Sequence, residues 1–520
     1  MTIETTWLEP TGLARGQDHL ATRAVCEILY TQLLPGLTNV TDRARYFTLY
    51  PWLLWVMDQE RVAADDRTLW FRKADCLLTL ISLAHGDGTE HGRAAVGSNV
   101  LGKALDTARV SGEPIQLSRW ARTDRHAEQY FAAKRGGLGQ YYQGPLEALG
   151  IVGSDDAGGL TWSRDLGLKF ATAVDAGTDR ARFARCLRDD QARVEDLEAL
   201  SGLCLCGLTH SAGERDAMLE LLWRDVDRRR TLGLVLALAR DLPEEAPLNV
   251  EVFRGVTATG ALSVDAPWAL PDTLEVVRKR WAIYQRSEWL SLAIQGLFWA
   301  TLVDLGPGGE LPTLASFGDH AVEAFLADMD LGTDTSFEDA VARVRDTLPA
   351  PTDWAHPDHE HARALRIFRR STQQQVATDA LRLVLALVAR GPLDDAFHDV
   401  TVSLPQRQQY PVNLLALGAR SRDVWTGQSL ANVVRDLVTT WGVRLHEHVA
   451  LRKLRNQLTD TFQVRQTERG TWQVIEAPLP AYGNPRFVQA VRVLTDLGAL
   501  GRDTGRPTPL GHDLLGRSHV

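Results

Sequence analysis

The chain has 520 residues, of which 44% are hydrophobic and 24% charged, and its formal net charge is -9. This length is enough for two to four domains with substantial cores. An acidic chain is not a general binder of polyanions, so any contact with nucleic acid has to come from a local basic patch. The 5 cysteines are too few and too scattered for a disulfide framework, which predicts a cytoplasmic location.

No segment predicts a signal peptide or a membrane span. The first residues, MTIETTWLEP, lack a basic region followed by an apolar run. The most apolar stretch, Trp289 to Val303, is shorter than the roughly 20 residues that a span needs. We expect a buried helix there and no membrane partner.

An aromatic-rich helix is expected to organise the N-terminal half of the chain. The segment from Pro35 to Met57 reads PGLTNVTDRARYFTLYPWLLWVM, with Thr41 as its cap and a kink at Pro51. Its large side chains, which predict a core helix, are Tyr46, Phe47, Tyr50, Trp52 and Trp55. Arg43 and Arg45 at its open end either serve structure, as buried arginines commonly do, or face a phosphate or a partner.

The sequence LLPGLTNVTDRARYFTLYPWLLW resembles the N-terminal signature of uncharacterised bacterial proteins, some of which are encoded in anti-phage defence loci. The resemblance covers about the first sixty residues. It implies a bacterial defence or mobile-element context, and no catalytic residue comes with it.

The remaining elements follow from hydrophobic periodicity. We expect a first helix in residues 13–34, another in 66–85, a loop in 85–102, a second aromatic-rich segment of one or two helices from Leu274, and a long helix in 359–390. Strand candidates lie in 398–416 and in a pair whose turn is 468–470. The two aromatic-rich segments are expected to share a core.

Two segments have the outline of a winged helix-turn-helix, which is a helix, a two-strand ribbon and a closing helix. In the first, strand Ile151-Val152 and strand Leu160-Thr161 flank a polar turn. In the second, a helix ends at Leu497-Gly498, strand Ala499-Leu500 follows, and a closing helix starts at Pro509.

We therefore predict a mainly α, multidomain helical protein with two winged-helix-like modules. The expected division is an N-terminal helical domain (1–125), a winged-helix-like module (126–178), a central helical domain (179–350), a helical or mixed segment (351–440) and a basic winged-helix-like module (441–520).

Basic side chains concentrate in the last of these segments. Winged helices place a recognition helix in the major groove and a wing along the backbone. The residues that would contact nucleic acid are Arg452, Lys453, Arg455, Arg486, Arg492, Arg502 and Arg506. The alternative is a solvated, salt-bridged surface.

Two groups of residues could hold a metal, although neither has a ligand spacing that predicts one. Histidines and carboxylates cluster in 353–361, where a capped helix start explains them better. Cys204, Cys206 and His210 lie close together but lack a fourth ligand, and cysteines in an apolar run are more often packed thiols. We expect no metal, no cofactor and no catalytic residue.

The favoured function is recognition of double-stranded DNA, without catalysis, in a bacterial defence or mobile-element system whose other subunits would be further partners. One alternative is a metal-dependent nuclease or effector using the 353–361 cluster. The other is a structural adaptor that binds proteins.

Overall fold

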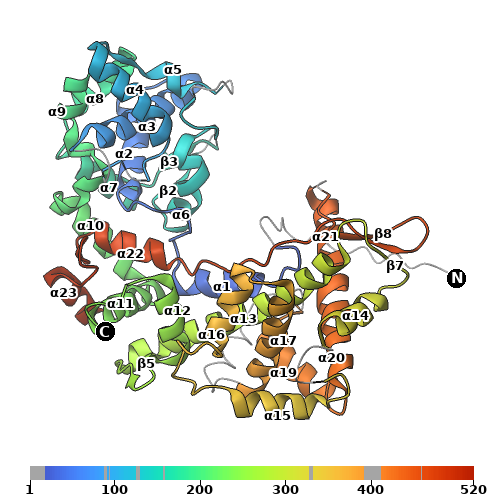
Figure 1. Ribbon diagram of the computed structural model, residues 1–520. Coiled ribbons are helices and arrows are strands. Elements are labelled where there is room, and N and C mark those ends of the chain that lie inside the picture. Colours follow the sequence, from blue (N-terminus) through green and yellow to red (C-terminus); the bar gives the residue numbers. More distant parts are fainter. Residues whose placement is uncertain are drawn as a thin grey trace. The chain divides into compact units, whose positions relative to one another are not determined.

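The computed structural model describes residues 18–86, 91–92, 94–123, 129–155, 158–326, 332–391, 411–457 and 460–519. These residues confirm the predicted fold class, because they are mainly helical and their strands form only short antiparallel sheets (Figure 1). None of the helices in the described ranges combines the length and the apolar character that crossing a bilayer requires.

The chain forms two compact units, and each is built from segments that are distant in sequence. Unit 1 comprises Met1–Leu33 and Val250–Asn484, and unit 2 comprises Leu34–Asn249 and Pro485–Val520. This division differs from the five consecutive segments expected from the sequence. In particular, the segment 441–520 is shared between the units, so its basic residues do not belong to one module.

Unit 1 is built around one long helix, α13 (Asp272–Leu305), which Figure 1 shows among α12, α16 and α17. The other helical elements of unit 1 are α1 (Ala24–Leu33), α12 (Val250–Thr259), α14 (Ala315–Ala321), η5 (Val322–Leu326), α15 (Phe337–Thr347), α16 (Glu360–Arg369), α17 (Gln373–Arg390), α19 (Leu414–Asp423), α20 (Leu430–Asp436), η7 (Leu437–Arg444) and α21 (Leu445–Gln457). Its strands are β5 (Ala261–Ser263), β6 (Ala266–Pro267), β7 (Glu310–Leu311), β8 (Val464–Gln466) and β9 (Trp472–Val474).

Buried polar contacts fix α13 to distant parts of unit 1. The Glu288 carboxylate accepts a hydrogen bond from the Gly483 backbone at 2.8 Å. A side chain at Gly483 would clash there, since an ideal Cβ would lie 1.9 Å from Glu288 Oε1. The Ser291 and Thr22 hydroxyls are 2.8 Å apart, which joins α13 to the residues before α1.

The long helix expected in 359–390 is instead two helices, α16 and α17. Arg370, with φ of 57°, ends the first in the left-handed conformation that closes many helices. The Thr372 hydroxyl then accepts from the Gln375 backbone and caps the second. The local capping chemistry therefore overrides a hydrophobic pattern that continues across the break.

The predicted strand pair around 468–470 is confirmed as β8 and β9. These strands pair antiparallel, with Val464 opposite Val474, and β7 adds to the free side of β9. Strands were also expected in 398–416. Residues 398–410 of this segment lie outside the described residues. In its described part, helix α19 begins at Leu414.

Unit 2 is also mainly helical. Its helical elements are α2 (Tyr46–Gln59), η1 (Ala64–Asp66), α3 (Arg67–Ala84), α4 (Ser98–Ser111), α5 (Leu117–Ala121), η2 (Leu138–Tyr142), α6 (Gln143–Ala148), α7 (Leu166–Asp175), α8 (Arg180–Arg188), α9 (Val194–Ala199), η3 (Ser201–Leu203), η4 (Leu205–Thr209), α10 (Ala212–Arg224), α11 (Val226–Asp241), α22 (Phe487–Asp496) and α23 (Pro509–Arg517). Its strands are β1 (Ile115–Gln116), β2 (Val152–Ser154), β3 (Leu160–Trp162) and β4 (Gln191–Ala192).

The aromatic helix α2 is a core helix of unit 2, as its composition predicts. The rings of Tyr46 and Tyr50 stack at 4.8 Å, and Trp52 packs against Phe183 at 4.9 Å. The helix begins at Tyr46, so the expected cap at Thr41 is wrong. The Thr41 hydroxyl instead bonds the backbone of Thr38 and closes a turn before the helix.

The two aromatic-rich helices do not share a core. Helix α2 belongs to unit 2 and α13 to unit 1, and each packs within its own unit. Aromatic content predicts that a helix is buried, but it does not identify which neighbour buries it.

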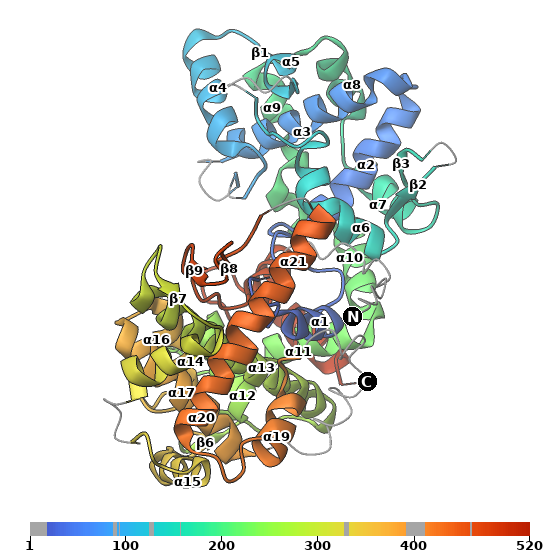
Figure 2. The ribbon, with the colours of Figure 1, turned by 90° about the vertical axis from the view of Figure 1, so that its right-hand side faces the viewer.

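The helix, hairpin and helix outline is present at both predicted places. Strands β2 and β3 pair with Val152 opposite Trp162, between α6 and α7, and Figure 2 shows this hairpin beside α2 and α7. Near the C-terminus a single bridge joins Leu500 to Pro507 between α22 and α23. This order of elements alone does not identify the two segments as winged helices. Their assignment as winged-helix-like modules stays a prediction.

A buried carboxyl group on α3 joins three parts of unit 2. Asp75 accepts hydrogen bonds from the Tyr130 hydroxyl at 2.8 Å, the Gly137 backbone at 3.0 Å and the Tyr50 hydroxyl at 3.2 Å. Burial raises its pKa from 3.8 to about 6, although these bonds oppose the rise. One turn earlier, the fully buried Arg72 donates to backbone carbonyls of the same region.

The raised pKa of Asp75 makes the stability of unit 2 depend on pH. The folded state holds this proton more tightly than the unfolded state, so the contribution is present at low pH and is lost as pH rises through about 6. Between about pH 4.5 and 7.5 the wild type should lose about 2 kcal/mol relative to Asp75→Asn, which cannot titrate. Denaturant unfolding of both proteins across this range checks the expectation, and parallel pH profiles would contradict it.

Candidate metal centre

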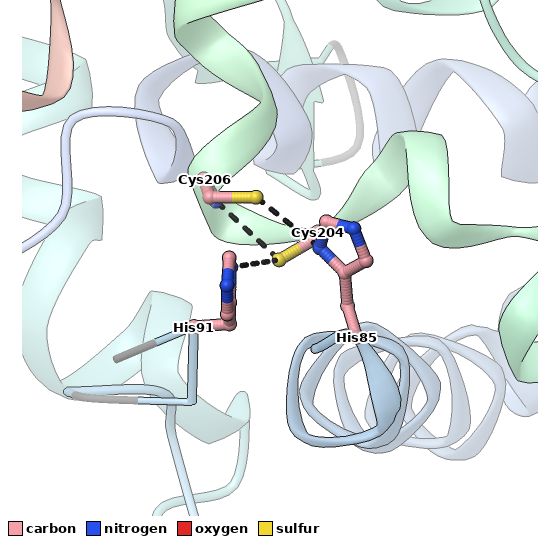
Figure 3. Close-up of side chains that lie close together, drawn as sticks. All are labelled: His85, His91, Cys204 and Cys206. Atoms are coloured by element: carbon pink, nitrogen blue, oxygen red, sulfur yellow. Dashed lines mark hydrogen bonds between the residues drawn. The ribbon is translucent and has the colours of Figure 1, made fainter. Parts of the chain in front are cut away.

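Four side chains of unit 2 form a group of potential metal ligands. They are His85, His91, Cys204 and Cys206, and one ligand atom from each lies within 4.8 Å of all the others. Figure 3 shows the two imidazoles and the two sulfurs pointing toward one another. Among the described residues, no other group of three or more histidine, cysteine or acidic side chains comes together in this way.

The end of helix α3 places His85, and Gly86 leaves room for the ring of His91. His85 is the first residue after the helix, where the backbone turns to an extended conformation. Gly86 follows with φ of 71°, a conformation that favours glycine. An ideal Cβ at Gly86 would lie 2.9 Å from the His91 ring, so a larger residue would push that ring away. The imidazole centroids are 4.7 Å apart.

A tight 3-10 segment places the two cysteines. Cys204 precedes η4, and its sulfur lies 3.5 Å from the backbone nitrogen of Cys206. Between them, the Leu205 backbone donates to the buried Ser82 hydroxyl on α3 at 3.1 Å. Because Ser82 lies on the last turn before His85, this bond joins the cysteine segment to the histidine segment directly.

Sulfur and nitrogen atoms pair across the group. Cys206 Sγ lies 3.3 Å from His85 Nδ1, and Cys204 Sγ lies 3.8 Å from His91 Nδ1. The contact with Cys206 lowers the pKa of the Cys204 thiol. The same contact, together with burial, raises the pKa of the Cys206 thiol.

The donor set fits zinc. Two thiolates and two imidazoles are a common tetrahedral Zn²⁺ set, with bonds of about 2.3 Å to sulfur and about 2.0–2.1 Å to nitrogen. Such bonds put neighbouring ligand atoms about 3.3–3.8 Å apart. The side chains therefore need only a small rearrangement to hold the ion. Thiolates also disfavour Mg²⁺ and Ca²⁺, which take oxygen ligands.

The sequence does not predict this arrangement. The sequence had grouped Cys204 and Cys206 with His210, but His210 is exposed and does not belong to the cluster. The missing ligands come from a segment that lies 113 residues earlier, measured from Cys204 to His91. Neither spacing matches a familiar zinc motif, so only the fold reveals the set.

The basic residues expected to bind nucleic acid are divided between the two units. Arg452, Lys453 and Arg455 are in unit 1, and Arg486, Arg492, Arg502 and Arg506 are in unit 2. In unit 1 Lys453 is buried and its ammonium lies 3.5 Å from the Asp18 carbonyl, whereas Arg455 is exposed.

Three of the unit 2 arginines make contacts inside the protein. Arg486 is buried and donates to the Leu34 carbonyl at 3.2 Å. Arg492 pairs with the Asp42 carboxylate. Arg506 donates to the carbonyls of Ala239 at 2.8 Å and Leu242 at 2.6 Å, and so caps the C-terminal end of α11. Arg502 is exposed.

The histidine and acid cluster at 353–361 makes local contacts. The His359 ring accepts from the His361 backbone and caps α16. Glu360 pairs with Arg390 at 2.8 Å. Burial lowers the pKa of His361 to about 3, and its ring packs against Trp354. These contacts agree with a capped helix start.

Comparisons with protein-family models, with curated proteins and with solved structures find no match to this chain. The proposals below therefore rest on the contacts of its own residues.

The contacts of Arg506 generate a test of its role. Replacing Arg506 with Gln should lower the free energy of unfolding by about 2 kcal/mol, because it removes charged hydrogen bonds to the end of α11. Arg109→Gln, which replaces an exposed arginine of the same unit, is the control and should change stability by less than about 0.5 kcal/mol. Equal stabilities of the two variants would show that Arg506 has no structural role.

Proposed function

We propose that this protein binds one zinc ion through Cys204, Cys206, His85 and His91. The observation that carries the proposal is the approach of the four ligand atoms to within 4.8 Å of one another. It is supported by the Ser82 to Leu205 hydrogen bond, which holds the two ligand segments together without the ion.

The zinc ion has a structural role in this proposal. Four protein ligands complete a tetrahedral zinc site, whereas a catalytic site keeps one position open for water or substrate. The ion would cross-link the end of α3 to the segment before α10. Because binding to the folded state alone stabilises that state, zinc should contribute directly to the stability of unit 2.

Metal analysis tests this function. The purified protein should contain about one zinc per chain, and Cys204→Ala should lose it, because three ligands hold zinc far less tightly than four. Cys186→Ala is the matched control, since Cys186 is a buried cysteine of the same unit outside the ligand group. A strong chelator should lower the Tm of the wild type and of the control but not that of Cys204→Ala. Absence of zinc from the wild type, with no binding of added Zn²⁺ or Co²⁺, would refute the function.

A second function, recognition of double-stranded DNA, is favoured by the two helix, hairpin and helix segments. It fits the defence or mobile-element context that the N-terminal signature implies, and other subunits of such a system would be its partners. In this second function the contacts with phosphate come from α21, where Arg455 is exposed and Arg452 is half-buried.

Duplex binding measured at several salt concentrations tests this second function. Replacing Arg452 and Arg455 together with Gln should weaken binding and reduce the salt slope by about 2, because each phosphate contact contributes about 1. Arg109→Gln removes an exposed arginine from α4 and should leave the slope unchanged. The idea fails if the wild type shows no duplex binding at low salt, or if both variants bind alike.

A further inference from the structure

The fully buried side chain of Arg45 contacts the backbone that carries the cysteine ligands. Its Nη1 atom donates to the Cys204 carbonyl at 2.5 Å and to the Gly202 carbonyl at 2.7 Å. The guanidinium also lies against Gly207, where an ideal Cβ would be 2.1 Å from Nη1. The guanidinium therefore contacts Cys204 itself and the two glycines, Gly202 and Gly207, that flank the cysteine segment.

The opposite side of the guanidinium is held by a carboxylate. Arg45 Nη2 and Nε donate to the two oxygens of Glu214 at 2.6 Å and 3.1 Å. The Thr48 hydroxyl donates to the same carboxylate at 2.9 Å. Arg45 and Glu214 are 2% and 1% exposed, so water does not compete for these bonds. The Glu214 carboxylate thereby fixes the orientation of the planar guanidinium that contacts the cysteine segment.

We propose that Arg45 is a positioning residue for the metal centre, and that it holds the Cys204–Gly207 backbone in the conformation that presents both sulfurs to the ion. This inference rests on the proposed zinc function. Of the two roles that the sequence allows for this arginine, the contacts favour the structural one, because Arg45 is buried and bonds the protein's own backbone and Glu214. Fixing the Cys204 carbonyl leaves its sulfur little freedom beyond rotation about one side-chain bond. Partners that orient ligands in this way commonly change metal affinity by about 10–100-fold.

The test compares zinc affinity in Arg45→Lys and in a matched control. Lysine keeps the charge, but its single nitrogen cannot take the places of the three nitrogens from which Arg45 donates to two carbonyls and a carboxylate. The control is Arg228→Lys, because Arg228 is a buried arginine of the same unit that donates to the carbonyls of Leu221, Leu222 and Pro35. Competition with a chelating dye should show zinc affinity about 10–100-fold weaker in Arg45→Lys and within about twofold of wild type in Arg228→Lys.

A spectroscopic measurement separates positioning from general loss of stability. With Co²⁺ in place of zinc, the sulfur-to-cobalt absorption should weaken or shift in Arg45→Lys and stay unchanged in Arg228→Lys. If Arg45→Lys does not fold, Glu214→Gln keeps the guanidinium but removes the charge that orients it, and zinc affinity should again fall several-fold.

Two different failures can be distinguished. Zinc affinity and cobalt spectra that are the same in wild type, Arg45→Lys and Glu214→Gln would overturn the role of Arg45 and leave the zinc site intact. A wild type that binds neither metal would refute the zinc function itself.

Discussion

Two arginines at the start of α2 hold together segments of unit 2 that are distant in sequence. Arg43 pairs with Asp496 on α22 at 3.2 Å, and Arg45 pairs with Glu214 on α10 at 2.6 Å. All four side chains are almost completely buried. Removing one partner of such a pair leaves an uncompensated charge and typically costs about 3–5 kcal/mol. A buried pair adds less net stability than this cost suggests, so its main effect here is to fix which segments meet.

Elements with strong local signals were predictable from the sequence. The helix expected in 66–85 spans Arg67–Ala84, and the β8–β9 turn contains Gly470 with φ of 82°. The errors occur where a local signal competes with another use of the same residue. Thr41 is a suitable helix cap, yet its hydroxyl closes an earlier turn. The assignment of α2 and α13 to different units depends on packing, which periodicity does not encode.

Half of the candidate metal centre was visible in the sequence. The two cysteines stand one residue apart, but two cysteines do not define a zinc site without their partners. His85 and His91 fall in a stretch that reads as a polar, glycine-rich loop, and the glycine at position 86 is now explained by the close approach of the His91 ring. The basic C-terminal residues show the opposite case. The sequence predicted that they form an exposed surface for nucleic acid. In the structure several of them bond backbone carbonyls of the protein.

The passage of the chain between the two units has a consequence for its synthesis on the ribosome. Unit 2 begins at Leu34, but α22 and α23, which pack on α11, are made only after the segment of unit 1 that ends at Asn484. Domains made from one continuous segment can fold as soon as they emerge. Here the segment from Leu34 to Asn249 cannot complete its packing until α22 and α23 have been made, because the surface of α11 that they cover stays open until then. The segment of unit 1 that ends at Asn484 is made in this interval.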